Sequence, residues 1–251
     1  MDGNSFSSEE FSGRTVLITG AAQGLGREIG QMFHDHGARI ILVDIDQRVQ
    51  QTAEDIDSGT ATAIGKIADL TDDTSVSSLR DAVIQEFGHI DTLINNAGTY
   101  APHAIRDISG SDFDKRIAIN LKTVFLTTQA FMDSLSSTQS GRVVNIASAD
   151  AYRPKVTNAP YAAAKAGVIS LTKSFAAELA PNVLVNGVSP GPIATDTAKT
   201  QGWLEKAINH HPLGYAAVPQ DIGRVVLFLA SPSNRFMNGE TIVVNGGTIM
   251  I

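Results

Sequence analysis

The sequence predicts an α/β protein, a single doubly wound domain of about seven parallel strands with helices on both faces. Short apolar runs alternate with stretches whose apolar residues recur at helical spacing along most of the 251 residues. Continuous runs of Val and Ile are typical of strands buried on both faces, as in parallel sheets. The chain has no linker, low-complexity block or fixed-period repeat that would divide it into domains.

The strands are predicted from apolar runs that stop at glycine or at a polar turn. The first, Arg14 to Gly20, ends in a glycine-rich stretch, and the second ends at Asp44 and Asp46. The last two are predicted from the Val-rich runs "NVLVNGVSPG" and "ETIVVNGG". In chain order the predicted strands lie within 14–20, 38–46, 60–70, 89–98, 141–148, 182–191 and 240–247.

The helices are predicted from apolar residues three and four positions apart. In the first, Leu25, Ile29 and Phe33 fall on one face, and Gly37 is placed to end the helix. The predicted helices cover 25–37, 74–88, 111–136, 161–179, 202–209 and 220–229. Because ligands of doubly wound sheets bind outside the carboxyl ends of the strands, each strand-to-helix junction is a candidate site.

Composition excludes several classes of function. The formal net charge of −7 argues against non-specific binding to nucleic acid, and the lack of cysteine excludes disulfides, zinc–thiolate sites and thiol nucleophiles. No apolar run approaches the ~18 residues of a membrane span. Residues 1–12 are polar and Ser-rich, and we expect a flexible tail before a domain at 13–251 in a cytoplasmic protein.

A glycine-rich loop, "TGAAQGLG", joins the first strand to the first helix. Gly20 permits a sharp turn, while Gly24 and Gly26 keep side chains away from a ligand and let the helix pack close to the sheet. The helix N-terminus then offers free N–H groups to a phosphate. The loop is therefore a candidate phosphate site, the alternative being a glycine-rich turn without a ligand.

Two carboxylates follow the next strands. Asp44 lies 18 residues past Gly26, close to the ~20 at which an acid binds the ribose hydroxyls of a dinucleotide. No Lys or Arg occupies 21–23 and Ile45 follows Asp44, so the pattern favours NAD over NADP. Alternatively, Asp44 or Asp46 caps the next helix. Asp69 either binds the adenine amine or caps a helix.

Further motifs follow in a fixed order, and together they resemble the short-chain dehydrogenase/reductase family from Gly13 to Gly247. That resemblance implies a Rossmann-type fold and an oxidoreductase that uses NAD. Besides the glycine loop, the motifs are "NNAG" at 95–98, Asn120 in "IAINLKTVF", Ser148 in "NIAS", "YAAAK" at 161–165 and "SPGPIATD" at 189–196.

The resemblance implies the catalytic roles. Tyr161 would be the general acid/base, one helical turn from Lys165, whose ammonium would favour the phenolate and whose amine would hold the nicotinamide ribose. Ser148 would donate a hydrogen bond to the substrate oxygen, and Asn120 would anchor a water that links Lys165 to solvent. Alternatively, Ser148 is a strand-end cap and Asn120 a buried helix residue bonded to backbone.

The resemblance also implies a set of cofactor-binding residues and no metal site. "NNAG" would mainly steady the central sheet, with Asn95 near the cofactor, while Ile193 would contact the carboxamide and Thr195 a phosphate. The predicted set is Gly20, Gln23, Gly24, Leu25, Gly26, Asp44, Asp69, Leu70, Asn96, Ala97, Gly98, Tyr161, Lys165, Pro190, Gly191, Ile193 and Thr195.

The substrate side is expected in two places. A covering segment is expected at about 194–218, where the adjacent histidines 210 and 211 indicate a lid helix rather than a metal site. Polar and aromatic side chains near Ser148 and "NNAG" favour a polyol, a sugar-like molecule or a cyclic diol. The residues expected to line the pocket are Tyr100, His103, Asp150, Tyr152 and Asn158.

Other functions stay open. One is a 3-oxoacyl-acyl-carrier-protein reductase, although that group typically prefers NADP and carries a basic residue where this chain has Ala177. Another is a dinucleotide-binding regulator without catalysis. The family resemblance also implies a homotetramer with a small-molecule alcohol or ketone as substrate, and without nucleic-acid or membrane partners. The apolar end, Thr248–Ile251, would lie at a subunit contact or pack within its own chain.

Overall fold

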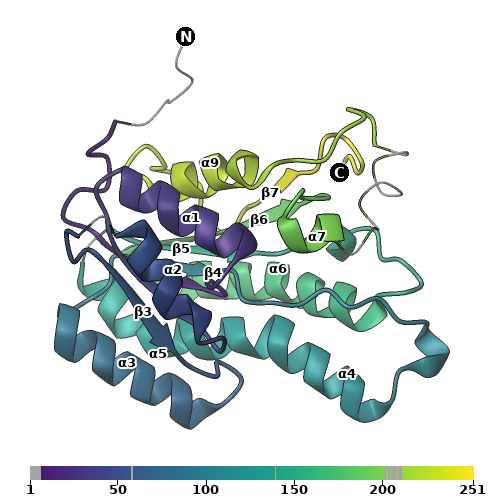
Figure 1. Ribbon diagram of the computed structural model, residues 1–251, viewed down its shortest axis with the longest axis horizontal. Coiled ribbons are helices and arrows are strands. Elements are labelled where there is room, and N and C mark those ends of the chain that lie inside the picture. The colour runs from purple at the N-terminus through teal and green to yellow at the C-terminus, as the bar shows by residue number, and fades with distance from the viewer. Residues whose placement is uncertain are drawn as a thin grey trace.

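The computed structural model describes residues 7–57, 59–138, 140–200, 202, 204, 208 and 211–251. Its centre is one parallel sheet of seven strands in the order β3-β2-β1-β4-β5-β6-β7 (Figure 1). The prediction of a doubly wound parallel sheet is confirmed. The strands are β1 Thr15–Thr19, β2 Arg39–Asp44, β3 Ala63–Ile67, β4 Thr92–Asn95, β5 Gly141–Ile146, β6 Val183–Pro190 and β7 Thr241–Val244.

Helices cover both faces of the sheet (Figure 1). Helices α1, α2 and α9 contribute to one apolar cluster, and α3, α5 and α6 contribute to the other. In β1, Val16 and Ile18 belong to the first cluster while Leu17 belongs to the second, as the two-residue period of a strand requires. The helices are α1 Gly24–Asp35, α2 Arg48–Ile56, α3 Asp73–Phe87, α4 Gly110–Ile117, α5 Thr123–Ser137, α6 Ala159–Leu179, α7 Asp196–Thr200 and α9 Pro219–Ala230.

One predicted helix differs from the structure, one was expected only indirectly, and one is mostly not described. The long helix expected over 111–136 contains a π-helical turn, Ala118–Lys122, between α4 and α5. Helix α2 was predicted without bounds, as the helix that Asp44 or Asp46 would cap. Most of the helix predicted over 202–209 lies outside the described residues.

The flexible tail expected over 1–12 is too long. Phe11 is fully buried, and its ring meets that of Phe33 edge-on with 4.8 Å between centroids. The Phe11 amide also donates to the His36 carbonyl at 2.9 Å. The packed domain therefore begins before residue 13, and residues 1–6 lie outside the described part.

The direction of the chain connections changes between β1 and β4, which are neighbours in the sheet. Helix α1 follows β1 on one face, while α4 and α5 follow β4 toward the other. The carboxyl ends of these strands are where a doubly wound sheet leaves a crevice for a ligand.

Candidate active site

In the glycine loop between β1 and α1, two glycines are closely packed and a third faces open space. A Cβ on Gly20 would lie 2.7 Å from Ala97 Cα, and one on Gly26 would lie 2.2 Å from the Gly20 carbonyl oxygen. Gly24, at φ +60°, has more open space, with Thr195 Cγ2 the nearest atom at 3.8 Å. Two of the glycines thus let the loop pack, and Gly24 keeps the space above it free.

Asn96 fastens this loop to the end of β4. Its side-chain amide donates to the carbonyls of Thr19 and Gly20 at 3.0 and 2.9 Å. The Thr19 hydroxyl in turn accepts from the backbone N–H groups of Asn96 and Ala97, both at 3.0 Å. The two strands that border the crevice are therefore held together by side chains as well as by their ladder.

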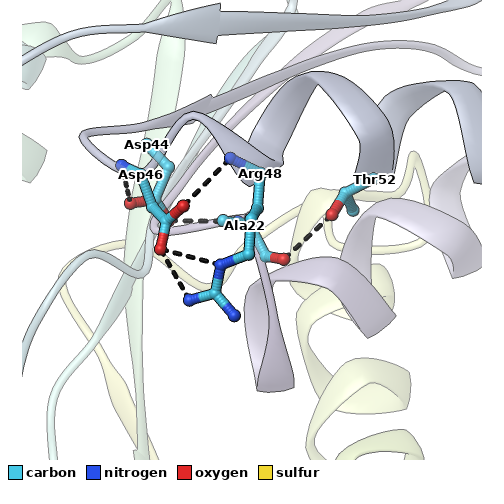
Figure 2. Close-up of polar contacts among 5 residues, drawn as sticks. All are labelled: Ala22, Asp44, Asp46, Arg48 and Thr52. Carbon is cyan, nitrogen blue, oxygen red and sulfur yellow. Dashed lines mark hydrogen bonds and ion pairs between the residues drawn. The ribbon is translucent and has the colours of Figure 1, made fainter.

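Asp44 is held rigidly at the edge of the crevice (Figure 2). Its Oδ2 accepts from the Ala22 amide and its Oδ1 from the Asp46 amide, each at 3.0 Å. Thr52 on α2 donates to the Ala22 carbonyl at 2.9 Å, which ties the glycine loop to that helix. Of the two aspartates, Asp46 is the one that contacts the start of α2: its Oδ1 accepts from the Arg48 amide at 2.9 Å, while Gln47 holds the N-cap position without a side-chain bond.

Asp69 forms a local turn after β3. Its carboxylate accepts from the backbone and the hydroxyl of Thr71 at 2.9 and 2.7 Å, and these bonds lower the pKa of Asp69. The helix-capping role left open for Asp69 belongs to Asp72, which accepts from the Ser75 amide at 2.7 Å.

A cavity of about 740 Å³ opens above these loops. At its base, Gln23 occupies the N-cap position of α1 without a side-chain cap bond, so the first N–H groups of the helix remain available to a phosphate. The open space over Gly24 fits the same use. Of the predicted cofactor residues, those that line this cavity are Gly20, Gln23, Gly24, Leu25, Gly26, Asp44, Asp69, Leu70, Asn96, Ala97, Gly98 and Thr195.

A second cavity, of about 730 Å³, adjoins the first and shares Leu25, Asn96, Gly98, Thr99 and Thr195 with it. Ser148 lines the second cavity. The remaining predicted cofactor residues also line it, namely Tyr161, Lys165, Pro190, Gly191 and Ile193.

Lys165 is buried beneath this second cavity. Its side chain is 3% exposed, and its amine donates to the Ile146 carbonyl at 2.7 Å. The amine lies 5.9 Å from the centroid of the Tyr161 ring, as expected for residues one turn apart on α6. Burial lowers the pKa of Lys165 to about 8, because the charged form loses its hydration.

Tyr161 faces the second cavity beside Ser148. Desolvation raises the pKa of Tyr161 to about 12, although a hydrogen bond with Ser148 acts in the opposite direction. The nearby Asp150 carboxylate raises the pKa further, since it opposes a second negative charge. Burial and the Asp150 charge therefore oppose the phenolate that Lys165 was expected to favour.

Asn120 lies in the π-helical turn and is fully buried. Its Oδ1 accepts from the Thr99 amide, and its Nδ2 donates to the Arg116 carbonyl, each at 3.0 Å. A Cβ on Gly98 would lie 2.8 Å from Asn120 Oδ1 and 3.4 Å from Lys165 Nζ, so both side chains approach Gly98. The backbone bonds anticipated as the structural alternative are present, and they hold Asn120 near Lys165.

The substrate pocket was predicted only in part. Tyr100 and Asp150 line the second cavity, and the Tyr100 ring meets Tyr161 edge-on at 5.2 Å. Tyr152, Asn158 and His103 are not among the residues that line it. Asn158 instead donates to Asp150 in a short hydrogen bond.

Two segments of the second cavity wall were not predicted. The segment after Ser148 contributes four residues, 153–156, and the C-terminal segment contributes Thr248 and Ile249. Asn245 donates to the Ile249 carbonyl at 3.0 Å, which holds that segment against its own chain. Arg153 and Lys155, on either side of Pro154, were the signal available in the sequence, since exposed cations soon after Ser148 can meet a substrate.

The expected lid is described only in part. Thr195 and Ala198, near α7, line the second cavity, whereas Tyr215 is exposed. Trp203 and His210 lie outside the described residues, and His211 is buried. Within the described part of the chain, acidic and histidine side chains form no group suited to a metal ion, and the helices include none with the length and hydropathy of a membrane span.

The doubly wound fold, with a glycine loop and cavities at the carboxyl ends of its strands, is the arrangement typical of dinucleotide-binding proteins, and comparisons with known proteins define the class further. Residues 20–248 match a family model described as enoyl-(acyl carrier protein) reductase. The BbsD subunit of a hydroxy(phenyl)methylsuccinyl-CoA dehydrogenase from Thauera aromatica is 36% identical over 93% of this chain and 96% of its own. The 3-oxoacyl-acyl-carrier-protein reductase FabG of Thermotoga maritima is 34% identical over 95% and 98%.

A crystal structure described as a short-chain dehydrogenase/reductase, glucose/ribitol dehydrogenase, from Brucella melitensis superposes with a TM-score of 0.88 at 34% identity. The match covers 96% of this chain and 99% of the other. The chain belongs to the short-chain dehydrogenase/reductase family. It is therefore an oxidoreductase that acts on CH–OH groups with a nicotinamide dinucleotide.

Proposed function

We propose that the protein is an NAD-dependent oxidoreductase that interconverts a secondary alcohol and its ketone, with a polyol, a sugar-like molecule or a cyclic diol as substrate. The observation that carries the choice of NAD is Asp44. Its carboxylate is fixed at the cavity edge by two backbone amides and can still accept from ribose hydroxyls. A 2′-phosphate at this place would meet a negative charge.

The cofactor would extend across both cavities. The glycine loop and the N-terminus of α1 would take its phosphates, and the second cavity would take its nicotinamide end, near Lys165 and Ile193. When bound, the nicotinamide supplies or accepts the hydride. The protein supplies the binding groups and the proton.

Tyr161 would exchange that proton with the substrate oxygen. Its raised pKa keeps the phenol protonated and ready to donate during ketone reduction. Ser148, hydrogen-bonded to Tyr161, would hold the same substrate oxygen. Lys165 and Asn120 would position the ribose and return protons from solvent.

The choice of a hydroxylated substrate rests on Asp150. Its side chain is 13% exposed, lines the second cavity and lies close enough to Tyr161 to affect its pKa. A buried carboxylate needs hydrogen-bond donors, which Asn158 and Lys155 supply in part. A second substrate hydroxyl would add another donor, whereas an acyl chain would not.

The second candidate is a 3-oxoacyl-acyl-carrier-protein reductase. FabG relatives at 33–34% identity support it, as do the exposed side chains of Arg153 and Lys155 at the second cavity. Such cations suit a phosphorylated carrier. Asp44 and the neutral Ala177 argue for the first candidate.

A spectrophotometric screen tests the proposal. Purified protein is mixed with NAD or NADP and with polyols, sugars, cyclic diols or hydroxyacyl thioesters, and reduced cofactor is measured. We expect activity with NAD and a diol, and a greater loss for Asp150→Ala with the diol than with the matching mono-alcohol. Preference for NADP with a thioester would replace the first candidate by the second, and binding of NADH without turnover of any compound would support a regulator.

Cytoplasmic location and a homotetramer belong to the same proposal. Cell fractionation tests the location, and light scattering tests the oligomeric state.

A further inference from the structure

Arg48, on the first turn of α2, brings a cation to the dinucleotide side of the molecule. The sequence next to Asp44 shows no such charge, because Arg48 lies four residues further along. In the structure the guanidinium is directed toward the loop that carries Asp44 and Asp46 (Figure 2). An arginine at this place is the side chain best suited to a phosphate on the ribose.

Asp46 is the hydrogen-bond and ion-pair partner of that arginine. Arg48 Nε and Nη2 donate to Asp46 Oδ2 at 2.9 and 2.6 Å, and the Arg48 amide donates to Oδ1 at 2.9 Å (Figure 2). The side-chain bond with Asp46 is the largest cause that raises the pKa of Arg48, and the charge of Asp44 contributes to the same shift. Arg48 is therefore paired with one carboxylate and within electrostatic reach of the other.

Asp44, Asp46 and Arg48 form a charged rim beside the first cavity, and its net charge is negative. Two carboxylates and one guanidinium sum to −1 at neutral pH. Without Asp46 the sum would be zero, and the guanidinium would be free to turn toward the ribose. The pair is well exposed, with 61% of the Arg48 side chain and 34% of the Asp46 side chain accessible. Exposed ion pairs are weak, so the discrimination that this pair provides is modest and falls with salt.

We propose that Asp46 is a specificity-determining residue, which sequesters Arg48 and so keeps the rim selective against a ribose 2′-phosphate. This inference rests on the proposed preference for NAD, in which Asp44 binds the ribose hydroxyls. Asp46 adds a second carboxylate and holds the Arg48 guanidinium, which would otherwise attract the phosphate.

Asp46→Asn tests the inference. Asparagine keeps an oxygen for the Arg48 amide and removes the charge that holds the guanidinium. The readout is calorimetric binding of adenosine 2′,5′-bisphosphate and of adenosine 5′-phosphate, so that no turnover is needed. We expect Asp46→Asn to bind the bisphosphate about fivefold more tightly at low salt, with little change for the monophosphate. The gain should disappear in the double variant Asp46→Asn, Arg48→Ala.

Asp81→Asn is the matched control. Asp81 accepts from Nε and Nη2 of Arg80 at 2.9 and 2.7 Å on α3, whereas Asp46 is bonded through its own amide to Asp44. An equal gain in Asp81→Asn would show an effect of net charge alone and overturn the inference. No gain in Asp46→Asn, or a gain that survives loss of Arg48, would also overturn it. Tighter binding of the bisphosphate by the unaltered protein would refute the NAD preference instead, and the comparison of the two variants would still test Asp46.

Discussion

The two ends of the bound dinucleotide would meet opposite electrostatic environments. At the rim near β2, Asp46 and Arg48 remain largely in water and are neutralised by each other. At the catalytic end, Lys165 is buried, and desolvation lowers its pKa to about 8 while raising the pKa of Tyr161 to about 12. Under the proposed function, recognition of the cofactor would rely on exposed charges that rearrange easily. Proton transfer would rely on groups whose protonation is set by burial.

The largest expected effect is at the catalytic end. Tyr161→Phe should lower kcat by ~10²–10⁴, the usual contribution of a general acid/base, because phenylalanine keeps the ring and removes the proton. NADH binding, followed by fluorescence titration, should stay within experimental error. Tyr152→Phe is the control, since Tyr152 is close in sequence but does not line either cavity. Retention of most activity by Tyr161→Phe would exclude this role.

A smaller effect is expected at the dinucleotide end, where close packing of the backbone, rather than burial of charged groups, determines the shape of the site. Gly26→Ala places a Cβ 2.2 Å from the Gly20 carbonyl oxygen, so the loop must move. We expect a loss of ~1–3 kcal/mol in the free energy of unfolding, measured in urea, together with weaker NADH binding. Gly110→Ala is the control, because a Cβ there meets nothing within 4 Å. Equal stability of the two variants would contradict the packing argument.

Much of this arrangement could be predicted because it depends on local pattern. The apolar runs and their glycine ends indicate the strands, and the four-residue spacing of Tyr161 and Lys165 places them on one face of a helix. The glycine loop and Asp44 follow from their spacing alone.

The remainder depends on contacts between segments far apart in the chain. The π-helical turn at Asn120 has an ordinary helical sequence pattern, and the closeness of Asn120 to Gly98, 22 positions earlier, is visible only in the structure. The burial of Phe11 depends on Phe33, 22 positions later. The pairing of Arg48 with Asp46 is local, but it depends on how the chain turns into α2, which charge spacing near Asp44 does not reveal.

The pH dependence of stability tests the electrostatic contrast most directly. Because the pKa of Lys165 is near 8 when folded and near 10.5 when unfolded, the unfolded chain binds more protons between these values. Stability should therefore increase as pH rises from 8 to 10, relative to Lys165→Met, by as much as ~1.4 kcal/mol per pH unit. Ionisation of Tyr161 would act in the opposite direction only above pH ~10. The free energies of unfolding are measured in urea at each pH. If they changed with pH by the same amount in both proteins, Lys165 would have its ordinary pKa and the account would be contradicted.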